Sequence, residues 1–419
     1  MIDLRLLRDE PDAVRAAYER RGGVKDLDKV IELNNTYRER LGQVERLRAE
    51  QNRASKAIGQ ASPEDRPAAI AEAKELSDRL KAAEPELEEI QNELERLASF
   101  LPNLPDATVP DGLTEEENVV EREVGDRPTF DFEPKTHVEL GEALGIFDSE
   151  RGAKTSGSRF VYLKGQGAIL ELALARFALD RLMSKGWTPM IPPVLVREHA
   201  MYGTGFLPAD EFEIYRLERD DLYLIGTSEV ALAAYHSDEV LDETALPLRY
   251  AGYSPCFRRE AGSYGKDTKG LIRVHQFDKI EQFSLTRPED SPAEYEQIRA
   301  NQEELLQALE LPYRVLRMCA GDLGSSAAVK VDNEAWLPGA ERFMEVTSAS
   351  NTTDYQSRRL KIRFRGAEGT QLVHTLNGTA FAIGRTIVAL LENHQQADGS
   401  VRIPEALRAY TGFDTLQAL

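Results

Sequence analysis

The chain is poor in cysteine and has no long apolar run. Two cysteines, Cys256 and Cys319, occur among 419 residues, which is too few for a disulfide framework, and no spaced Cys/His pattern indicates a zinc site. No stretch approaches the roughly 20 apolar residues that cross a bilayer. The charged N-terminal segment lacks the apolar centre of a secretory signal. These absences argue against a secreted or membrane protein and favour the cytoplasm.

Basic charge is also scarce relative to acidic charge. The formal net charge is −20, from 52 Lys and Arg against 72 Asp and Glu. Indiscriminate binding to nucleic acid depends on neutralising phosphates, so any such contact must use a local basic patch. Hydrophobic residues make up 41% of the chain, which is enough for a core, and the length suggests two or three domains.

Apolar residues follow a heptad spacing in two stretches near the N-terminus. In 69–101 they recur three and four residues apart, at Ala73, Leu76, Leu80, Ala83, Leu87, Ile90, Leu94, Leu97 and Leu101. Residues 28–60 have a matching series, at Val30, Leu33, Tyr37, Leu41, Val44, Leu47, Gln51, Ala54 and Ile58. This spacing is typical of a coiled-coil seam. We predict an antiparallel helical hairpin over about residues 27–101, with a kink at Pro85.

The two predicted helices differ in charge. Residues 28–60 hold seven Lys or Arg and five acidic residues, whereas residues 69–97 hold four and nine. The first helix is therefore the local basic surface, with candidate contacts at Arg38, Arg46, Arg48, Arg53 and Lys56. Charge alone leaves two interpretations open, a nucleic-acid-binding surface and an ordinary solvated face of a coiled coil.

The rest of the chain mixes helices and strands. Residues 102–128 are rich in proline and acidic residues and are typical of a linker. Amphipathic or apolar helices are predicted over 168–186 and 379–395. Strand-like segments between them include LYLIGTSEV, LRYAGYSPCFRRE, LIRVHQFDKIEQF and FMEVTSAS. Because strands and helices do not alternate regularly, we predict an α+β fold with an antiparallel sheet.

One strand-like segment carries a stripe of functional groups. If residues 271–283 form a strand, one face presents Arg273, His275, Phe277, Lys279 and Glu281. Guanidinium groups bind phosphate, an aromatic ring stacks on a base, and a carboxylate accepts from an ammonium or hydroxyl group. The stripe suits a nucleotide, although a solvated sheet face with cross-strand ion pairs would look similar.

The preceding GSYGKDTKG segment is not a Walker phosphate loop. That motif needs four residues between its glycines and Ser or Thr after its lysine. Here two residues separate Gly262 from Gly265, and Asp267 follows Lys266.

Six segments, taken together and in their order, carry a family resemblance. FRREAGSYGKDTKGLIRVHQFDKIEQF (257–283) resembles motif 2 of the class II aminoacyl-tRNA synthetases, in the form found in seryl-tRNA synthetases. KGWTPMIPPV (185–194) and LNGTAFAIGRTIVALLENHQ (376–395) resemble motifs 1 and 3. Further blocks are similar at GTSEV (226–230), AGDLGSSAA (320–328) and EVTSASNTTDYQSRR (345–359). The resemblance covers essentially the whole chain.

The resemblance implies an organisation and an activity. It implies an N-terminal tRNA-binding domain over 1–110 with the coiled-coil arm, a linker over 111–128 and a class II catalytic domain over 129–419. It implies an enzyme that activates L-serine with ATP and Mg²⁺, then transfers serine to the 3′-terminal adenosine of tRNA(Ser), with tRNA(Sec) as a further expected substrate. A homodimer is expected, because motif 1 is the family's dimer element. A cytoplasmic location is expected as well.

The resemblance also implies roles for individual residues. The implied catalytic residues are Arg258, Glu260 and Arg385. The implied serine-binding residues are Thr227, Ser228, Glu229, Glu281 and Thr379. The implied ATP-binding residues are Arg258, Arg259, Glu260, Arg273, Val274, Phe277, Glu345, Val346, Thr347, Ser348 and Arg385, of which Glu345 and Ser348 are associated with Mg²⁺. The basic residues of the arm are the implied tRNA contacts.

The chain departs from the family pattern at two positions. Ser228 stands where alanine is common, and Met344 stands where an arginine usually precedes the glutamate. These positions are where a duplicate enzyme tolerant of a serine-mimicking inhibitor would differ. Two further alternatives stay in view. One is an adenylate-forming relative that charges a carrier protein, which would give no reason to keep the arm. The other is a coiled-coil RNA-binding protein with an inactive domain, against which the presence of Arg258, Glu260, Glu281 and Arg385 counts.

Overall fold

The computed structural model describes residues 1–261 and 269–418 of the chain. It divides into two compact units, Met1–Pro102 and Asn103–Leu419. Most of the GSYGKDTKG segment lies outside the described residues, so the structure does not bear on its comparison with a Walker loop. The domain boundaries inferred from the resemblance stay a prediction.

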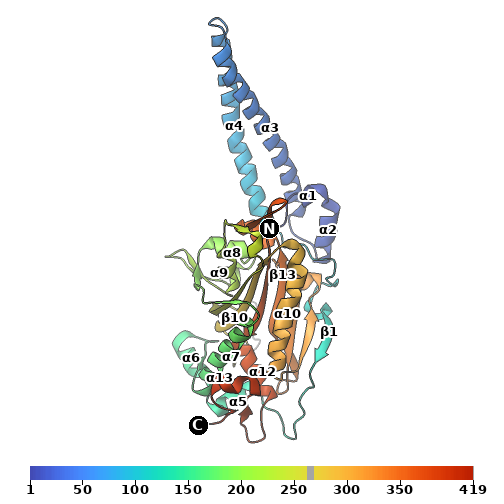
Figure 1. Ribbon diagram of the computed structural model, residues 1–419, viewed down its shortest axis with the longest axis vertical. Coiled ribbons are helices and arrows are strands. Elements are labelled where there is room, and N and C mark those ends of the chain that lie inside the picture. Colours follow the sequence, from blue (N-terminus) through green and yellow to red (C-terminus); the bar gives the residue numbers. More distant parts are fainter. Residues whose placement is uncertain (262–268, 419) are drawn as a thin grey trace. The chain divides into compact units, whose positions relative to one another are not determined.

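The first unit is a helical hairpin with two short helices before it (Figure 1). Its helices are α1 Leu6–Asp9, α2 Pro11–Arg20, α3 Leu27–Gln60 and α4 Arg66–Ala98. Every predicted seam position of α3 and α4 is buried or half-buried. Ion pairs link the two helices, including Lys29 with Glu93 at 3.1 Å and Arg48 with Glu84 at 2.8 Å. The predicted antiparallel hairpin is confirmed, and α4 continues through Pro85.

The second unit is built on an eight-stranded sheet. Its strands, in spatial order, are β1 Val119–Val124, β11 Tyr313–Arg317, β12 Val329–Leu337, β13 Arg342–Thr353, β16 His374–Ala382, β10 Gln276–Thr286, β9 Leu248–Phe257 and β4 Thr188–Met190. All neighbours are antiparallel except β4 and β9. The predicted α+β class with an antiparallel sheet is confirmed.

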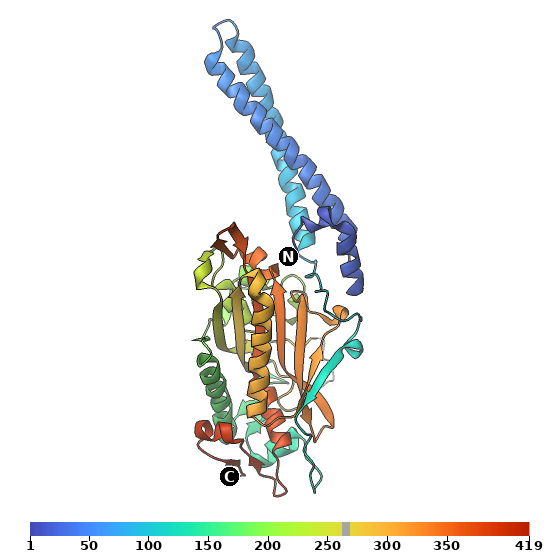
Figure 2. The ribbon, with the colours of Figure 1, turned by 45° about the vertical axis from the view of Figure 1, so that its right-hand side comes forward.

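Three long helices supply apolar side chains to the core of this sheet. They are α7 Gln166–Met183, α10 Ser291–Ala308 and α12 Ile383–Asn393. Figures 1 and 2 show α10 running along the sheet beside β13 and β10. Leu170, Ile298 and Ile387 of these helices join strand residues such as Ile280 and Phe381 in one buried cluster. Since side chains alternate along a strand, the residues between these core positions face the other side of the sheet.

Shorter elements complete the second unit. The helices are α5 His137–Leu144, α6 Ser149–Ser156, α8 Glu198–Thr204, α9 Glu229–Ala234, α11 Tyr355–Leu360 and α13 Glu405–Thr411. The 3₁₀ helices are η1 Glu115–Glu117, η2 Glu211–Glu213, η3 Glu243–Ala245, η4 Pro288–Asp290 and η5 Ala320–Asp322. The small sheets use β2 Phe147–Asp148, β3 Tyr162–Leu163, β5 Leu195–Val196, β6 Tyr215–Leu217, β7 Leu222–Leu224, β8 Val240–Asp242, β14 Arg363–Gly366, β15 Gly369–Leu372, β17 Val401–Arg402 and β18 Thr415–Leu416.

The interpretation of 111–128 as a linker is wrong in part. This segment contains η1 and β1, and β1 pairs with β11 at the edge of the main sheet. Valines suit a pleated strand, and Glu121 of β1 accepts hydrogen bonds from Arg299 at 2.6 Å and Arg317 at 2.5 Å. One of the acidic residues that suggested a linker, Glu121, is therefore a partner of two arginines in the sheet.

The described helices include none that is both long and apolar enough to span a membrane.

Candidate active site

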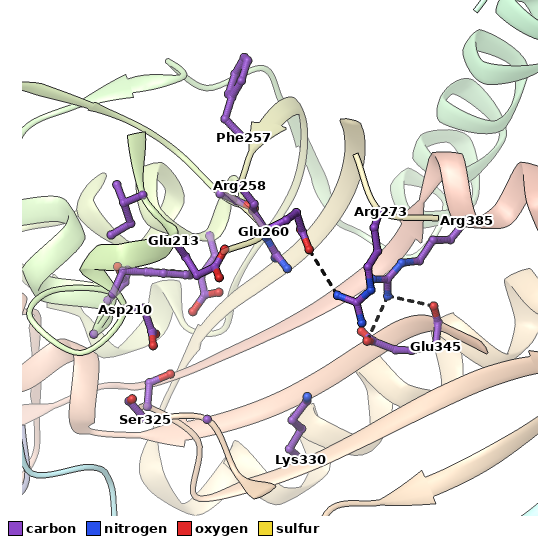
Figure 3. A pocket seen from close by; sticks show the side chains of 18 residues that line it. Asp210, Glu213, Phe257, Arg258, Glu260, Arg273, Ser325, Lys330, Glu345 and Arg385 are labelled. Atoms are coloured by element: carbon purple, nitrogen blue, oxygen red, sulfur yellow. Dashed lines mark hydrogen bonds and ion pairs between the residues drawn. The ribbon is translucent and has the colours of Figure 1, made fainter. Parts of the chain in front are cut away.

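A cleft of about 540 Å³ lies in the second unit (Figure 3). Its charged lining residues are Asp210, Glu213, Glu229, Arg258, Glu260, Arg273, Lys330, Glu345 and Arg385. A smaller cavity of about 50 Å³ shares Arg258, Glu260, Glu345 and Arg385 with the cleft and adds Val274, Phe277, Lys279, Val346 and Thr379. Residues distant in the sequence therefore meet at one place on the sheet.

Two arginines are held in the cleft by backbone carbonyl groups. Arg258 follows β9, and its Nε donates to the carbonyl oxygen of Gly226 at 3.2 Å. Arg385 lies in the first turn of α12, where Nε donates to Ile272 O at 3.3 Å. Its Nη1 donates to the carbonyl oxygen and to Oε2 of Glu345, both at 3.1 Å. These anchors orient guanidinium groups that can bind phosphate oxygens in pairs.

The aromatic and acidic stripe is confirmed over part of its length. β10 begins at Gln276, so Phe277 and Lys279 lie on the strand and both line the small cavity. Lys279 Nζ is 2.5 Å from Glu281 Oε2, as expected for side chains two residues apart on one face. The Arg258 guanidinium lies 5.5 Å from the centre of the Phe277 ring.

Arg273 and His275 precede the strand, which corrects the prediction that 271–283 is one strand. Arg273 still reaches the cleft, where its Nη1 donates to Glu260 Oε2 at 3.3 Å (Figure 3). His275 Nδ1 instead lies 3.0 Å from the carbonyl oxygen of Arg258. The ring of His275 contacts the aromatic rings of Phe160 and Tyr215. The alternation of side chains expected for a strand therefore applies only from Gln276 onward.

Glu229 is a deeply buried carboxylate at the start of α9. The hydroxyl group of Thr227 accepts from the Glu229 backbone N–H at 3.2 Å. Glu229 Oε1 accepts from Gln356 Nε2 at 2.7 Å and from Asn377 Nδ2 at 3.0 Å. Burial, together with the charge of Glu281, raises the pKa of Glu229 to about 7. An incoming ammonium group would stabilise its ionised form.

Thr379 connects the acidic groups to the last strand of the site. Its hydroxyl group donates to Glu281 Oε2 at 3.4 Å, and the register of β10 and β16 places the two residues opposite each other. Lys279, Glu281 and Thr379 therefore form one polar cluster, and Lys279 and Thr379 line the small cavity together with Arg258 and Arg385.

A β-bulge places Glu345 and Ser348 on the same face of β13. In the register with β12, Ser348 is opposite Asp332 and Glu345 is opposite Glu334, with one extra residue between Thr347 and Glu345. Asp332 and Glu334 share a face of β12, so their partners share one too. Burial disfavours a charged Glu345, but Arg385 and Lys330 outweigh burial and hold its pKa below the usual range.

The oxygen atoms near the bulge fit a magnesium ion. Mg²⁺ prefers carboxylate and other hard oxygen ligands and keeps several waters. Besides the side chains of Glu345 and Ser348, the face presents Asp332, whose Oδ1 is buried and has no hydrogen-bond partner among the described residues. Oxygen donors of the kind that Mg²⁺ prefers are therefore present, whereas the described residues include no group of three or more His, Cys, Asp or Glu side chains that could hold a metal ion.

Six predicted site residues line neither cavity, namely Thr227, Ser228, Arg259, Glu281, Thr347 and Ser348. Three of them, Ser228, Thr347 and Arg259, have partners away from the cleft. Ser228 is fully buried, and its hydroxyl group donates to Gly252 O at 3.5 Å. Thr347 accepts from Asn333 Nδ2 at 2.9 Å on the opposite face of the sheet from Glu345. Arg259 is exposed, with its guanidinium 5.8 Å from the Tyr215 ring. Met344 is buried in the main core cluster, so the departure from the family's arginine adds an apolar core contact.

Several residues of the site were missed by sequence reasoning. Lys330 lines the cleft, and its Nζ lies 3.2 Å from Asp332 Oδ2. Lys330 and Asp332 are two positions apart, and this spacing could have indicated that both side chains lie on the same face of a strand. Gln356 and Asn377 both donate to Glu229, yet no pattern in the sequence marks these amides as partners of a residue more than a hundred positions away.

Most of the antiparallel sheet and of the cleft lies in the part of the chain that matches a class II aminoacyl-tRNA synthetase family. The family described as tRNA synthetase class II core domain (G, H, P, S and T) matches residues 212–394, which include this sheet's central strands. The family described as Seryl-tRNA synthetase N-terminal domain matches residues 1–105. The chain belongs to the seryl-tRNA synthetase family.

Relatives match over their whole length. A serine–tRNA ligase of Nocardia farcinica is 53% identical over 419 residues, covering 100% of this chain and 99% of that protein. A serine–tRNA ligase of Thermobifida fusca is 51% identical, with the same coverage. The crystal structure of seryl-tRNA synthetase from Pyrococcus horikoshii, solved with ATP, is 44% identical and superposes with a TM-score of 0.93 over 100% of both chains.

Proposed function

We propose that this chain activates L-serine with ATP and transfers the seryl group to the 3′-terminal adenosine of tRNA(Ser), and of tRNA(Sec). The observation that carries the proposal is the pairing of two kinds of group in one site. Arg258 and Arg385 suit the phosphates of ATP, and the acidic Glu229, which lines the same cleft, suits an amino acid's ammonium group. Glu281 is buried, lines neither cavity and is paired with Lys279. The proposal also rests on the family to which the chain belongs.

Activation requires a carboxylate to attack a phosphate that is already negatively charged. An oxygen of the serine carboxylate bonds to the α-phosphorus of ATP, and the bond from that phosphorus to the pyrophosphate oxygen breaks. Negative charge grows on the phosphate oxygens, and we assign its stabilisation to Arg258 and Arg385, whose carbonyl anchors fix them before the substrate binds. No covalent bond to the enzyme is needed.

Phe277 and Glu260 complete the nucleotide site in this account. Phe277 offers its ring to the adenine base, with Val274 beside it. Glu260, whose backbone has a positive φ of 51°, is held by Arg273 and is assigned to the adenine amino group. Glu345 and Ser348 would hold Mg²⁺, which when bound would supply positive charge to the phosphates.

The serine end of the site uses charge and hydrogen bonding. Glu229 and Glu281 accept hydrogen bonds from the ammonium group and the hydroxyl group, and Thr379 adds its own hydroxyl. A site that pairs with a substrate OH group rejects alanine, because its buried polar groups would lose their partner. The seryl-adenylate carbonyl is then attacked by a ribose hydroxyl of the tRNA, and AMP leaves.

The arm, the oligomeric state and the location complete the proposal. The exposed basic residues of α3, Arg38, Arg46, Arg53 and Lys56, are assigned to tRNA, and so is Arg48, although it is paired with Glu84. A homodimer and a cytoplasmic location are proposed on the family resemblance.

The direct test is ATP–pyrophosphate exchange with each amino acid in turn. We expect exchange with serine and background rates with alanine and threonine. Arg258→Ala should lose exchange by at least about a hundredfold, as expected for loss of a charge-stabilising donor, while its thermal unfolding stays close to that of the parent chain. Exchange that another amino acid supports better than serine, or an active Arg258→Ala variant, would refute the assignment.

A further inference from the structure

Gln356 is a completely buried amide behind the proposed serine site. It lies on α11, and both ends of its side chain have partners. Nε2 donates to Glu229 Oε1 at 2.7 Å and to the carbonyl oxygen of Thr204 at 3.3 Å. Oε1 accepts from the hydroxyl group of Thr375 at 2.8 Å. Gln356 lines neither cavity, so it touches the carboxylate from the side away from the substrate.

These partners admit one orientation of the amide. Glu229 and the Thr204 carbonyl group are acceptors, so both need the NH₂ end of Gln356. The Thr375 hydroxyl group supplies the donor for the other end. Thr375 is itself held by Thr352, whose Oγ1 lies 2.5 Å away and donates to the Thr375 carbonyl oxygen at 2.8 Å. A flipped amide would direct a carbonyl oxygen at a buried carboxylate.

We propose that Gln356, oriented by Thr375, is a positioning residue that fixes the Glu229 carboxylate for the substrate's ammonium group. The inference rests on the function proposed above. Two amides, from Gln356 and Asn377, donate to the same oxygen, Oε1. The other oxygen of Glu229 is thereby the one left to the substrate.

The positioning role should affect the binding of serine but not the binding of ATP. Gln356 contacts the residue assigned to the amino acid and none of the residues assigned to the phosphates. The hydrogen bond from Gln356 stabilises the ionised form of Glu229, so losing this bond should lower the affinity for serine. As the pH falls, the remaining affinity should also begin to decline at a higher pH than in the parent chain. The charged groups that influence Glu229, namely Glu281, Lys279 and Arg258, are unchanged by substitutions at Thr375.

The test uses the full-length Thr375→Val and Thr375→Ser variants in serine-dependent ATP–pyrophosphate exchange. Valine has threonine's shape but no hydroxyl group, whereas serine keeps the donor. We expect Thr375→Val to raise the KM for serine at least about fivefold, as for a weakened bond to a charged group, and to change kcat and the KM for ATP less than about twofold. Thr375→Ser should stay within about twofold of the parent chain in all three.

A double-mutant cycle with Gln356→Met tests whether Thr375 acts through the amide. Gln356→Met should raise the serine KM by about tenfold, and adding Thr375→Val should raise it no further, because residues in one hydrogen-bond network are coupled. Should Thr375→Val fail to fold, Thr375→Ala removes the same hydroxyl group without adding a methyl group beside Thr352 and replaces it in the cycle.

The outcomes distinguish this inference from the proposed function. Absence of serine-dependent exchange in the parent chain overturns both. With an active parent chain, four results would overturn the positioning role alone. In two of them, Thr375→Val leaves the serine KM unchanged or raises the KM values for serine and ATP equally. In the other two, Thr375→Ser is as impaired as Thr375→Val, or the effects in the cycle are additive. A serine-specific rise that Thr375→Ser restores and that is not additive supports it.

Discussion

At the scale of the residue, Glu229 connects burial to substrate binding. The residue is 8% exposed, and the charge of Glu281 acts on its carboxylate. Protonated Glu229 has no charge to offer an ammonium group, and binding an ammonium group to the protonated form requires release of its proton. Serine affinity should therefore be retained above the pKa of about 7 and lost progressively below it.

We predict that the serine KM at saturating ATP rises by up to about tenfold per pH unit as pH falls from about 7. The KM for ATP, measured in the same series, is the internal control. Glu229→Gln should bind serine weakly and show no such rise, because its amide does not titrate in this range. A parent chain whose serine KM is flat from about pH 8 to about pH 6 would show that Glu229 does not meet the ammonium group.

Which individual residues could be predicted depended on whether their role is local. Arg258, Arg273, Arg385 and Phe277 were predicted from short motifs and do line the site, whereas Arg259 does not. Ser228 and Thr347 were carried over with their neighbours, but each side chain is directed to the opposite side by local helix and strand geometry. Gln356 was missed because it reaches Glu229 across 127 positions in the chain.

At the scale of the element, irregularities of the strands decide the site. The bulge in β13 gives Glu345 and Ser348 a common face, although their spacing of three predicts opposite faces on a regular strand. The late start of β10 removes Arg273 and His275 from the predicted stripe. The heptad spacing, by contrast, predicted α3 and α4 closely. The pattern repeats many times along each helix, so one irregular position such as Pro85 does not obscure it.

The packing of α9 on β9 gives a prediction for one glycine. A Cβ atom at Gly252 would lie 2.7 Å from Ser228 Oγ and 2.8 Å from Leu232 Cδ1, so Gly252→Ala must displace the side chains of Ser228 and Leu232 or the helix that begins at Glu229. Overpacking of this kind costs about 1–3 kcal/mol. We expect a lower melting temperature and a raised serine KM.

Gly42→Ala is the matched control for this prediction. Gly42 lies inside α3, and a Cβ atom there would meet no atom within 4 Å. Alanine should stabilise that helix by up to about 1 kcal/mol and leave the serine KM unchanged. A Gly252→Ala variant as active and as stable as the Gly42→Ala variant would contradict the account of how α9 is positioned.

At the scale of the whole molecule, the two units separate the two halves of the proposed reaction. All residues assigned to serine and ATP lie within Asn103–Leu419, and the basic helix α3 lies within Met1–Pro102. The heptads predicted the helical hairpin of the first unit, and the irregular succession of strands and helices predicted the antiparallel sheet of the second. It did not predict that β1 joins the main sheet, because a single short strand in an acidic segment gives little signal.

The measurement that tests the central claim most directly compares exchange with transfer when the arm is shortened. The variant lacks residues 35–92, joined by a short turn, and keeps the ion pair of Lys29 with Glu93 at the base of the hairpin. The account predicts serine-dependent ATP–pyrophosphate exchange within about twofold of the full chain. It predicts that serine transfer to tRNA falls at least about a hundredfold, or about 2.7 kcal/mol. Transfer as fast as in the full chain would contradict the account.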